Sequence, residues 1–170
     1  MSTPSASAIS VSDDLELRPT TSRDLATLRD FFSDSGFNQH WGGRPLTDDE
    51  IRTKYTGQRS PQVECFLVEQ SHAPIGFIQY WVDEHGGEGG GIDFALVPAA
   101  RGVGIGTMVV QALVQYLLTE HHWPRVTVDP DIANVRGVNF WKAAGFRTEQ
   151  LIDHDPERVP YQLMSWPIEK

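Results

Sequence analysis

Residues 100–107 read ARGVGIGT, a stretch with three glycines, one arginine and no acidic side chain. Glycine lets a backbone turn tightly and lets a ligand approach where a Cβ would otherwise stand. A helix-like run follows, and the first amides of a helix have no partners inside it, so they attract an anion. The pattern predicts a phosphate-bearing ligand, with Arg101 adding a charge, and an ordinary helix start is the alternative. The amides concerned belong to Val103, Gly104, Ile105, Gly106 and Thr107.

Two common phosphate-binding loops do not fit this turn. The dinucleotide-binding pattern G-x-G-x-x-G lacks its third glycine, since that position holds Thr107 when the count starts at Gly102. The Walker loop requires Gly-Lys-Ser/Thr, whereas Gly106 is followed by Thr107 and Met108. If this turn binds a phosphate, it belongs to another class of site.

The charge of the chain limits its partners. A formal net charge of −9 argues against nucleic acid and anionic membranes, which both need a basic surface, and is compatible with a cationic small molecule. No apolar run approaches the ~18 residues that a membrane-crossing helix needs. The six histidines show no metal-ligand spacing, so we expect no metal.

Length and composition indicate one domain. A chain of 170 residues can bury a sizeable core. Residues 1–14 are rich in Ser, Ala and Pro, which predicts a disordered leader before a folded domain at 15–170. The single cysteine, Cys65, lies in an apolar run and is expected in the core. Because it cannot form an intrachain disulfide, we expect a cytoplasmic protein. For the oligomeric state we expect either a monomer or a homodimer.

The elements that must position these residues follow from hydrophobic periodicity. The predicted order is β-α-α-β-β-β-α-β-α-β-β, which is an α/β single domain with a mixed sheet. Strands are predicted at 15–20, 62–70, 75–84, 91–97, 124–130, 146–152 and 161–168, and helices at 24–34, from 47, at 105–119 and at 135–145. The glycine-rich run 85–91 is expected to be a flexible turn.

Capping residues mark three helix ends. Thr21 or Ser22 can cap the first helix, and Thr47 with Glu50 has the spacing of a capping box. Gly145 stands where the last helix needs a left-handed residue to stop.

Two motifs at matching separation resemble the GNAT superfamily of acetyl-CoA-dependent N-acetyltransferases. RGVGIG at 101–106, after a strand and Pro98, matches the superfamily motif R/Q-x-x-G-x-G/A. DPDIANVRGVNFWKAAGF at 129–146 resembles the second signature, an Asn followed by a short helix that ends in an aromatic residue and then A/L-G-F. The order of elements matches too, and the resemblance covers the chain from about Leu15.

This resemblance implies a place for each part of acetyl-CoA. The strand before the glycine turn splays from its parallel neighbour, and the pantetheine arm lies in the gap. The backbone of Phe94, Ala95 and Leu96 pairs with that arm, and a backbone N–H there stabilises the oxyanion. The turn 101–106, with Gly102 inside it, holds the pyrophosphate, and Asn134 touches the pantetheine arm or the adenosine end.

Within the superfamily, three shorter stretches resemble aminoglycoside 6′-N-acetyltransferases. They are HWGG at 40–43, GID at 91–93 and VDP at 128–130. GID is the most informative, because it implies a carboxylate on the splayed strand facing the acceptor amine.

An amine attacks a thioester only when it is neutral, so a protonated primary amine must first lose its proton. Asp93 and Asp129 come late in adjacent strands and are the candidate catalytic and acceptor-binding residues. We expect Asp93 to contact the amine and Asp129 to support it, and these roles are interchangeable. Trp41, Asp153 and Asp155 are further candidates for the acceptor wall, although Trp41 can equally be a packing residue and loop acids are usually solvated.

One position departs from the superfamily pattern. A tyrosine seven residues after the Asn often protonates the leaving thiolate, and this chain has Trp141 there. An indole N–H is not a usable acid. The thiolate then takes a proton from water or from another group, and Tyr161 and Tyr80 are candidates.

Three functions therefore stay open. The first is acetyl transfer from acetyl-CoA to an aminoglycoside amine, most directly the 6′-amine. The second keeps the fold and changes the acceptor to a siderophore intermediate, a polyamine or a protein N-terminus. The third is a CoA-binding module without turnover, which Trp141 leaves possible.

Overall fold

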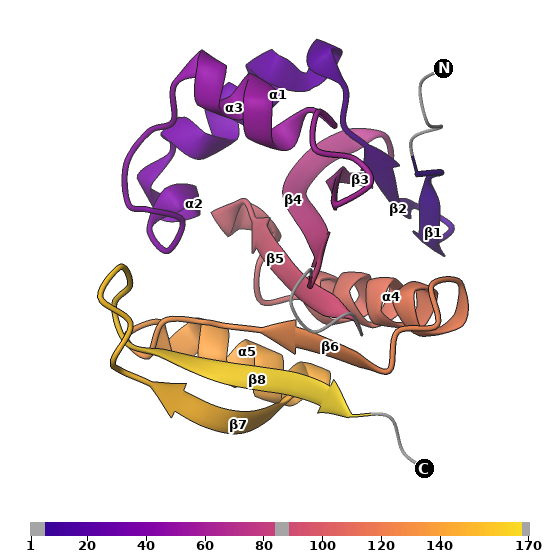
Figure 1. The fold of residues 1–170 in the computed structure, drawn as a ribbon. Helices are drawn as coiled ribbons and strands as arrows, with labels where there is room; N and C mark the ends of the chain where they lie inside the picture. The colour runs from indigo at the N-terminus through magenta and orange to yellow at the C-terminus, as the bar shows by residue number, and fades with distance from the viewer. Residues whose placement is uncertain (1–5, 84–88, 168–170) are drawn as a thin grey trace.

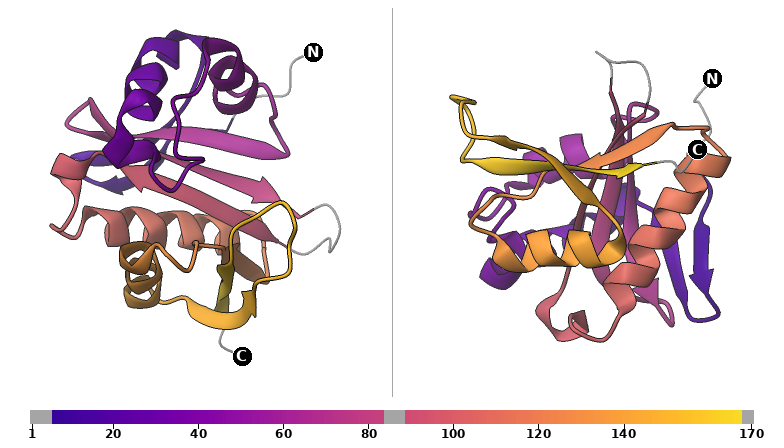
Figure 2. Two further views of the ribbon diagram at one scale, coloured as in Figure 1. Left: turned by 90° about the vertical axis from the view of Figure 1, so that its left-hand side faces the viewer. Right: turned by 90° about the horizontal axis from the view of Figure 1, so that it is seen from below.

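The computed structural model of the chain describes residues 6–83 and 89–167, and shows one sheet with helices on both faces (Figures 1 and 2). The strands are β1 Ile9–Ser12, β2 Leu15–Pro19, β3 Val63–Gln70, β4 Ala73–Val82, β5 Gly90–Leu96, β6 Arg125–Val128, β7 Arg147–Ile152 and β8 Tyr161–Pro167. The helices are α1 Leu25–Ser33, α2 Ser35–Asn38, α3 Asp48–Tyr55, α4 Ile105–Thr119 and α5 Val135–Ala144, with 3₁₀ turns at Ser22–Asp24 and Pro98–Ala100. The predicted turn at 85–91 lies outside the described residues at positions 85–88.

The strands follow the order β1-β2-β3-β4-β5-β6-β8-β7, and every neighbouring pair is antiparallel except β5 and β6. That parallel pair is joined only at Gly90 with Val126 and at Gly91 with Thr127. From Ile92 onward, β5 pairs with β4 alone. The predicted mixed sheet with splayed strands is therefore confirmed.

The closed end of this splay depends on glycine. A Cβ on Gly90 would lie 1.8 Å from the Trp81 carbonyl oxygen, and one on Gly91 would lie 2.3 Å from the Trp81 indole. Thr127 Oγ1 also donates a hydrogen bond to the Gly90 carbonyl at 3.2 Å. Because β5 and β6 are pinned here, their separation further along opens a wedge rather than dividing the sheet.

The core lies on both faces of the sheet. On one face, α4 packs against the sheet through Val110, Leu113 and Leu117, which are fully buried. On the other face, α1, α2 and α3 cover a second cluster around Phe32 and Phe77. Figure 2 shows these two groups of helices on opposite sides of the strands.

The prediction for Cys65 is confirmed, since it is buried in the cluster under α1 to α3. Burial raises the pKa of its thiol to about 12. The thiolate is therefore scarce at neutral pH, and Cys65 is a packing residue rather than a nucleophile.

The prediction of a disordered leader over 1–14 is wrong for residues 9–12. These form β1, which pairs with β2 through Ile9 with Leu17 and Ser10 with Glu16. Ile9 is buried against the α4 face of the core. The serine-rich composition hid the short alternation in ISVS, and tertiary pairing decided its structure.

The predicted caps are confirmed. Thr21 and Asp24 form a capping box ahead of α1, and Thr47 and Glu50 form one ahead of α3. Gly145 ends α5 with a φ of +117°. The short α2 was not predicted, and it begins where the Asp34 carboxylate accepts from the Gly36 and Phe37 amides.

Candidate active site

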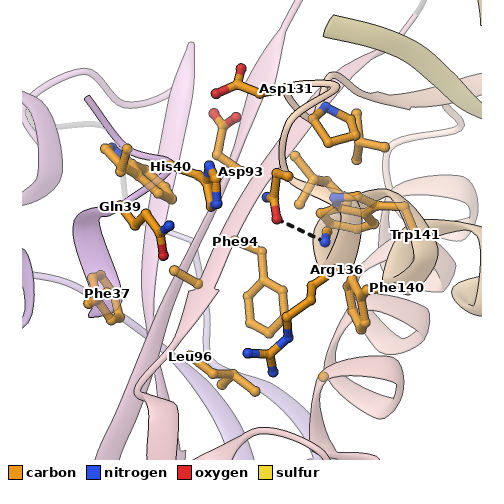
Figure 3. Close-up of a pocket in the computed structure, with 18 of the residues that line it drawn as sticks. Phe37, Gln39, His40, Asp93, Phe94, Leu96, Asp131, Arg136, Phe140 and Trp141 are labelled. Atoms are coloured by element: carbon orange, nitrogen blue, oxygen red, sulfur yellow. Dashed lines mark hydrogen bonds between the residues drawn. The ribbon is translucent and has the colours of Figure 1, made fainter. Parts of the chain in front are cut away.

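A cavity of 710 Å³ lies where β5 and β6 separate. One end is bordered by Trp41, Asp93 and Asp129, and the other by the glycine turn before α4. Figure 3 shows Asp93, Asp131 and His40 together at the first end and Arg136 toward Leu96 at the second. We call the first the acceptor end and the second the turn end.

The backbone of β5 presents alternate residues to the gap. Val97 N donates to Ile75 O on β4 at 2.9 Å. The backbone N–H and C=O groups of successive residues alternate in direction along a strand. Those of Phe94 and Leu96 therefore point away from β4, while those of Ala95 point toward it. The expectation that all three residues offer backbone groups to a ligand is therefore wrong for Ala95, which lines the cavity without a free backbone edge.

The glycine turn has the backbone that its sequence predicts. Gly102 and Gly104 have φ values of +82° and +88°, and Gly104 is the N-cap of α4. A Cβ on Gly106 would lie 3.0 Å from the Phe140 ring, so this glycine allows α4 and α5 to approach closely. Of the predicted turn residues, those that line the cavity are Arg101, Gly102, Gly104, Gly106 and Thr107. Val103 is 71% exposed and Ile105 packs against the core, so these two can contribute only their amides.

Arg101, which was predicted to add a positive charge for the phosphate, lines the cavity, and its guanidinium is held by carbonyl oxygens. Its guanidinium donates to Leu96 O at 2.8 and 3.1 Å and to Gly36 O at 2.8 Å. Burial and the nearby charge of Arg136 lower the pKa of Arg101. Arg101 therefore ties the turn to β5 and α2, and Arg136 is the exposed cation at the turn end.

Sequence reasoning missed Arg136, although it lies within the second motif. It is the second residue of α5, close to the helix N-terminus that Asn134 caps. Asn134 Oδ1 accepts from Gly137 N at 2.9 Å, and a Cβ on Gly137 would lie 2.3 Å from Asn134 Nδ2. Asn134 lines the cavity, and its side-chain oxygen Oδ1 caps and orients α5.

Asp93 stands on β5 at the start of the gap, directly opposite Gln79 of β4. Gln79 Nε2 donates to Asp93 Oδ2 at 2.9 Å. Burial, followed by the negative charge of Asp129, raises the pKa of Asp93 to about 6. The structure therefore brings the two predicted carboxylates close enough to interact. It also brings the pKa of Asp93 near to neutral pH.

Asp129 follows β6 and binds Arg158, a cavity residue that the sequence did not single out. Arg158 Nη1 donates to Asp129 Oδ2 at 2.7 Å. Asp131 also lines the cavity and lies 3.8 Å from the same guanidinium. The acceptor end therefore holds three carboxylates and one internal cation.

The predicted wall residues Asp153 and Asp155 are not among the residues that line this cavity. Asp153 is exposed beside His154, and Asp155 Oδ1 accepts from Glu157 N within its own loop. Asp131 takes the place that these two were expected to fill. The spacing of acids in a loop does not reveal which side chain turns inward, because no periodicity governs it.

Trp41 is both a wall of the cavity and a packing residue, the two roles that were considered for it. It lines the cavity and also packs edge-to-face on Phe32 and Phe77. Its Nε1 donates to the Tyr55 hydroxyl at 2.8 Å. The indole is thus a fixed wall of the acceptor end.

Trp141 lines the cavity at the position where the superfamily pattern has a tyrosine. Tyr80 and Tyr161 are absent from the lining: the Tyr80 hydroxyl lies 3.5 Å from His121, and the Tyr161 ring lies under Arg158. Among the described lining residues Tyr55 is the one tyrosine, and burial raises the pKa of its hydroxyl.

In the parts of the chain that the structure describes, no group of His, Cys, Asp and Glu is arranged to hold a metal ion. None of the helices described is both long and apolar enough to cross a membrane.

Comparison with known proteins identifies the class that this sheet and cavity define. Residues 14–147 match the acetyltransferase (GNAT) domain, so the chain belongs to the GNAT family of acetyltransferases. It is an acetyl-CoA-dependent N-acetyltransferase.

Among individual relatives, aminoglycoside N(6′)-acetyltransferase type 1 of Klebsiella pneumoniae is 30% identical over 156 residues, which cover 82% of this chain and 77% of the relative. The protein of the same name from Serratia marcescens matches equally. A kanamycin resistance protein of Rhizobium radiobacter is 32% identical over 75 residues, which cover 44% of this chain and 69% of that protein.

Solved structures of acetyltransferases superpose on this chain. AAC(6′)-Ib in complex with ribostamycin and coenzyme A superposes with a TM-score of 0.80 at 26% identity, covering 91% of this chain and 94% of that one. A ribosomal L7/L12 α-N-protein acetyltransferase in complex with coenzyme A has a TM-score of 0.78 at 17% identity over 95% of this chain and 98% of that one, which shows a shared fold alone.

Proposed function

We propose that the chain transfers the acetyl group of acetyl-CoA to a primary amine of an aminoglycoside, most directly the 6′-amine. The observation that carries this proposal is the meeting of Asp93, Asp129 and Asp131 at the acceptor end, next to the gap along β5. Asp93 on β5 and the two carboxylates that follow β6 outnumber the single guanidinium of Arg158, so this end keeps an excess of negative charge that attracts a cationic amine. The relatives named for the 6′ position support this choice of amine.

The turn end suits the phosphates and arm of acetyl-CoA, which supplies the thioester when bound. The first amides of α4 point out of a turn that two left-handed glycines shape. Arg136 adds a cation at the same end. Along β5, the backbone of Phe94 and Leu96 faces the gap, although the Leu96 carbonyl already accepts from Arg101. In this arrangement the Phe94 amide, next to Asp93, is the donor that stabilises the oxyanion.

Asp93 is the proton acceptor in this proposal. The bound ammonium group first loses one proton and becomes a neutral amine. The nitrogen–carbon bond then forms and the carbon–sulfur bond breaks, while a second proton leaves the nitrogen for water and the sulfur departs as a thiolate. With a pKa of about 6, Asp93 is a carboxylate at neutral pH and a stronger base than an ordinary aspartate. Asp93 takes the first proton, the one that the ammonium group must lose before it attacks, either directly or through water. Trp141 offers no acid, so the thiolate is protonated by water.

A thiol-release assay with acetyl-CoA and a panel of amines tests the function. We expect release with kanamycin, and NMR of the product should place the acetyl group at the 6′ nitrogen. An aminoglycoside with a hydroxyl in place of the 6′-amine is the matched control and should react far more slowly.

Two results would contradict the proposal. Turnover with polyamines or siderophore intermediates but not with aminoglycosides would assign another acceptor to the same chemistry. Tight coenzyme A binding without thiol release from any amine would identify a binding module.

A further inference from the structure

Arg158 places a positive charge inside the end of the cavity that the proposed function reserves for a cation. It belongs to the loop between β7 and β8. Its Nη1 donates to Asp129 Oδ2 at 2.7 Å, and its Nη2 donates to the Asp129 backbone O at 3.1 Å. Nη2 also lies 3.8 Å from Asp131 Oδ1. One guanidinium therefore engages two of the three carboxylates and leaves only Asp93 without a direct arginine contact.

The guanidinium of Arg158 is held in place by contacts on more than one side. Its Cζ lies 3.8 Å from the centroid of the Tyr161 ring, within the range of a cation–π contact. Two backbone hydrogen bonds of 3.0 Å join the segments that carry these partners, from Gln162 N to Pro130 O and from Ile132 N to Pro160 O. Asp129, Asp131 and Tyr161 together form a cation-binding subsite, and Arg158 fills it.

This occupied subsite bears on which amines enter. An acceptor with one ammonium group can reach Asp93 and leave Arg158 in place. An acceptor with further ammonium groups nearby meets the positive guanidinium, and it must either displace it or accept the repulsion between like charges.

We propose that Arg158 is a specificity-determining residue that occupies a second ammonium subsite and so weakens the binding of polycationic acceptors relative to acceptors with a single ammonium group. The inference rests on the proposed function in that it takes the acceptor to be a cationic amine. It extends that function to a choice among amines.

Calorimetric titration of Arg158→Gln with coenzyme A present tests this inference. The probes are glucosamine, with a single amine, and the linear tetra-amine spermine. We expect spermine to bind about five-fold more tightly to the variant than to the wild type, because Asp129 and Asp131 are released, and glucosamine to change by less than about two-fold. Arg158→Lys keeps the charge and should preserve the wild-type discrimination.

Arg52→Gln is the matched control. Arg52 is an exposed arginine on α3 that pairs with Asp49 at 2.9 Å and does not line the cavity. Its loss removes one positive charge from the surface without touching the subsite, so both amines should bind as to the wild type.

A second variant tests the inference if Arg158→Gln does not fold. With Arg158 in place, Asp131 is not free for the ligand, so Asp131→Asn should change the affinity for spermine by less than about two-fold. A five-fold loss would show that Asp131 binds the ligand directly and would overturn the proposal. So would weaker spermine binding to Arg158→Gln, or an equal gain for both amines. These titrations need no turnover, so a failure of aminoglycoside acetylation would contradict the proposed function and leave the inference on Arg158 to be decided separately.

Discussion

The two ends of the cavity differ in the chemical groups that form them. The turn end is mostly backbone: glycines with positive φ, the first amides of α4 and the edge of β5. The acceptor end is mostly side chains: Asp93, Asp129, Asp131 and Arg158 from separate segments. A site made of amides binds the same anion wherever the turn forms. A site made of charges depends on how each charge alters its neighbours.

This difference should appear when each end is changed separately. A substitution at the turn end should alter the affinity for acetyl-CoA and leave the acceptor chemistry intact. A substitution at the acceptor end should alter turnover, pH dependence or amine choice and leave cofactor binding intact.

The largest expected effect is that of Asp93→Asn, which removes the proposed proton acceptor. We expect kcat/KM at neutral pH to fall by about 100-fold with the affinity for coenzyme A within about two-fold of the wild type. Steady-state kinetics and calorimetry measure the two quantities. Asp153→Asn is the control, because Asp153 is exposed and outside the cavity. An unchanged rate in Asp93→Asn would remove Asp93 from the mechanism.

At the turn end, Gly104→Glu places a carboxylate where the phosphates are expected. Titration should show coenzyme A binding weakened by about 30-fold, since like charges repel where the amides favour an anion. Gly104→Ala shares the strain at a φ of +88° without the charge. Equal losses in both variants would assign the effect to backbone strain and contradict the phosphate site.

Arg136→Gln should weaken coenzyme A binding by about five-fold, because one exposed cation at the turn end is lost. High salt should reduce the difference between the variant and the wild type. Lys142→Gln, in the last turn of the same helix and outside the cavity lining, is the control. If Arg136→Gln binds coenzyme A normally at low salt, Arg136 does not serve the cofactor.

The smallest effect is a shift in pH dependence. Asp93 has a pKa of about 6, and below that pH it is protonated and cannot accept a proton, so kcat/KM should fall as the pH drops through this value. Asp129→Asn removes a negative neighbour, which lowers the pKa of Asp93, so the acidic limb should move down by about half a unit to one unit. A limb that stays in place or moves to higher pH would show that Asp129 does not act on Asp93.

Much of the fold follows from local sequence. The capping boxes at Thr47 and ahead of α1, the stop at Gly145 and the alternation in the central strands all appear where they were predicted. The strand β1 escaped prediction, because four residues of mixed polarity become a strand only when β2 lies beside them.

The site divides in the same way. The backbone of the turn end could be predicted, because the glycines at 102 and 104 permit positive φ and the glycine at 106 lets α4 and α5 approach closely. At the acceptor end, Asp93 and Asp129 were found because each lies on a strand or directly after it. Asp131, Arg158 and Arg136 were missed, and Asp153 and Asp155 were misplaced, because loop and surface side chains carry no periodic signal.

The sequence by itself determined most of the helices, most of the strands and the turn before α4, because caps, glycines and hydrophobic periods act over a few neighbouring residues. Only the tertiary structure decided that the guanidinium of Arg101 binds carbonyl oxygens, that Arg158 reaches Asp129, and that Asp93 holds its proton more tightly than a free aspartate. Those outcomes depend on distances between segments far apart in the chain. Electrostatic contacts form through space, and local sequence does not encode which charges will meet.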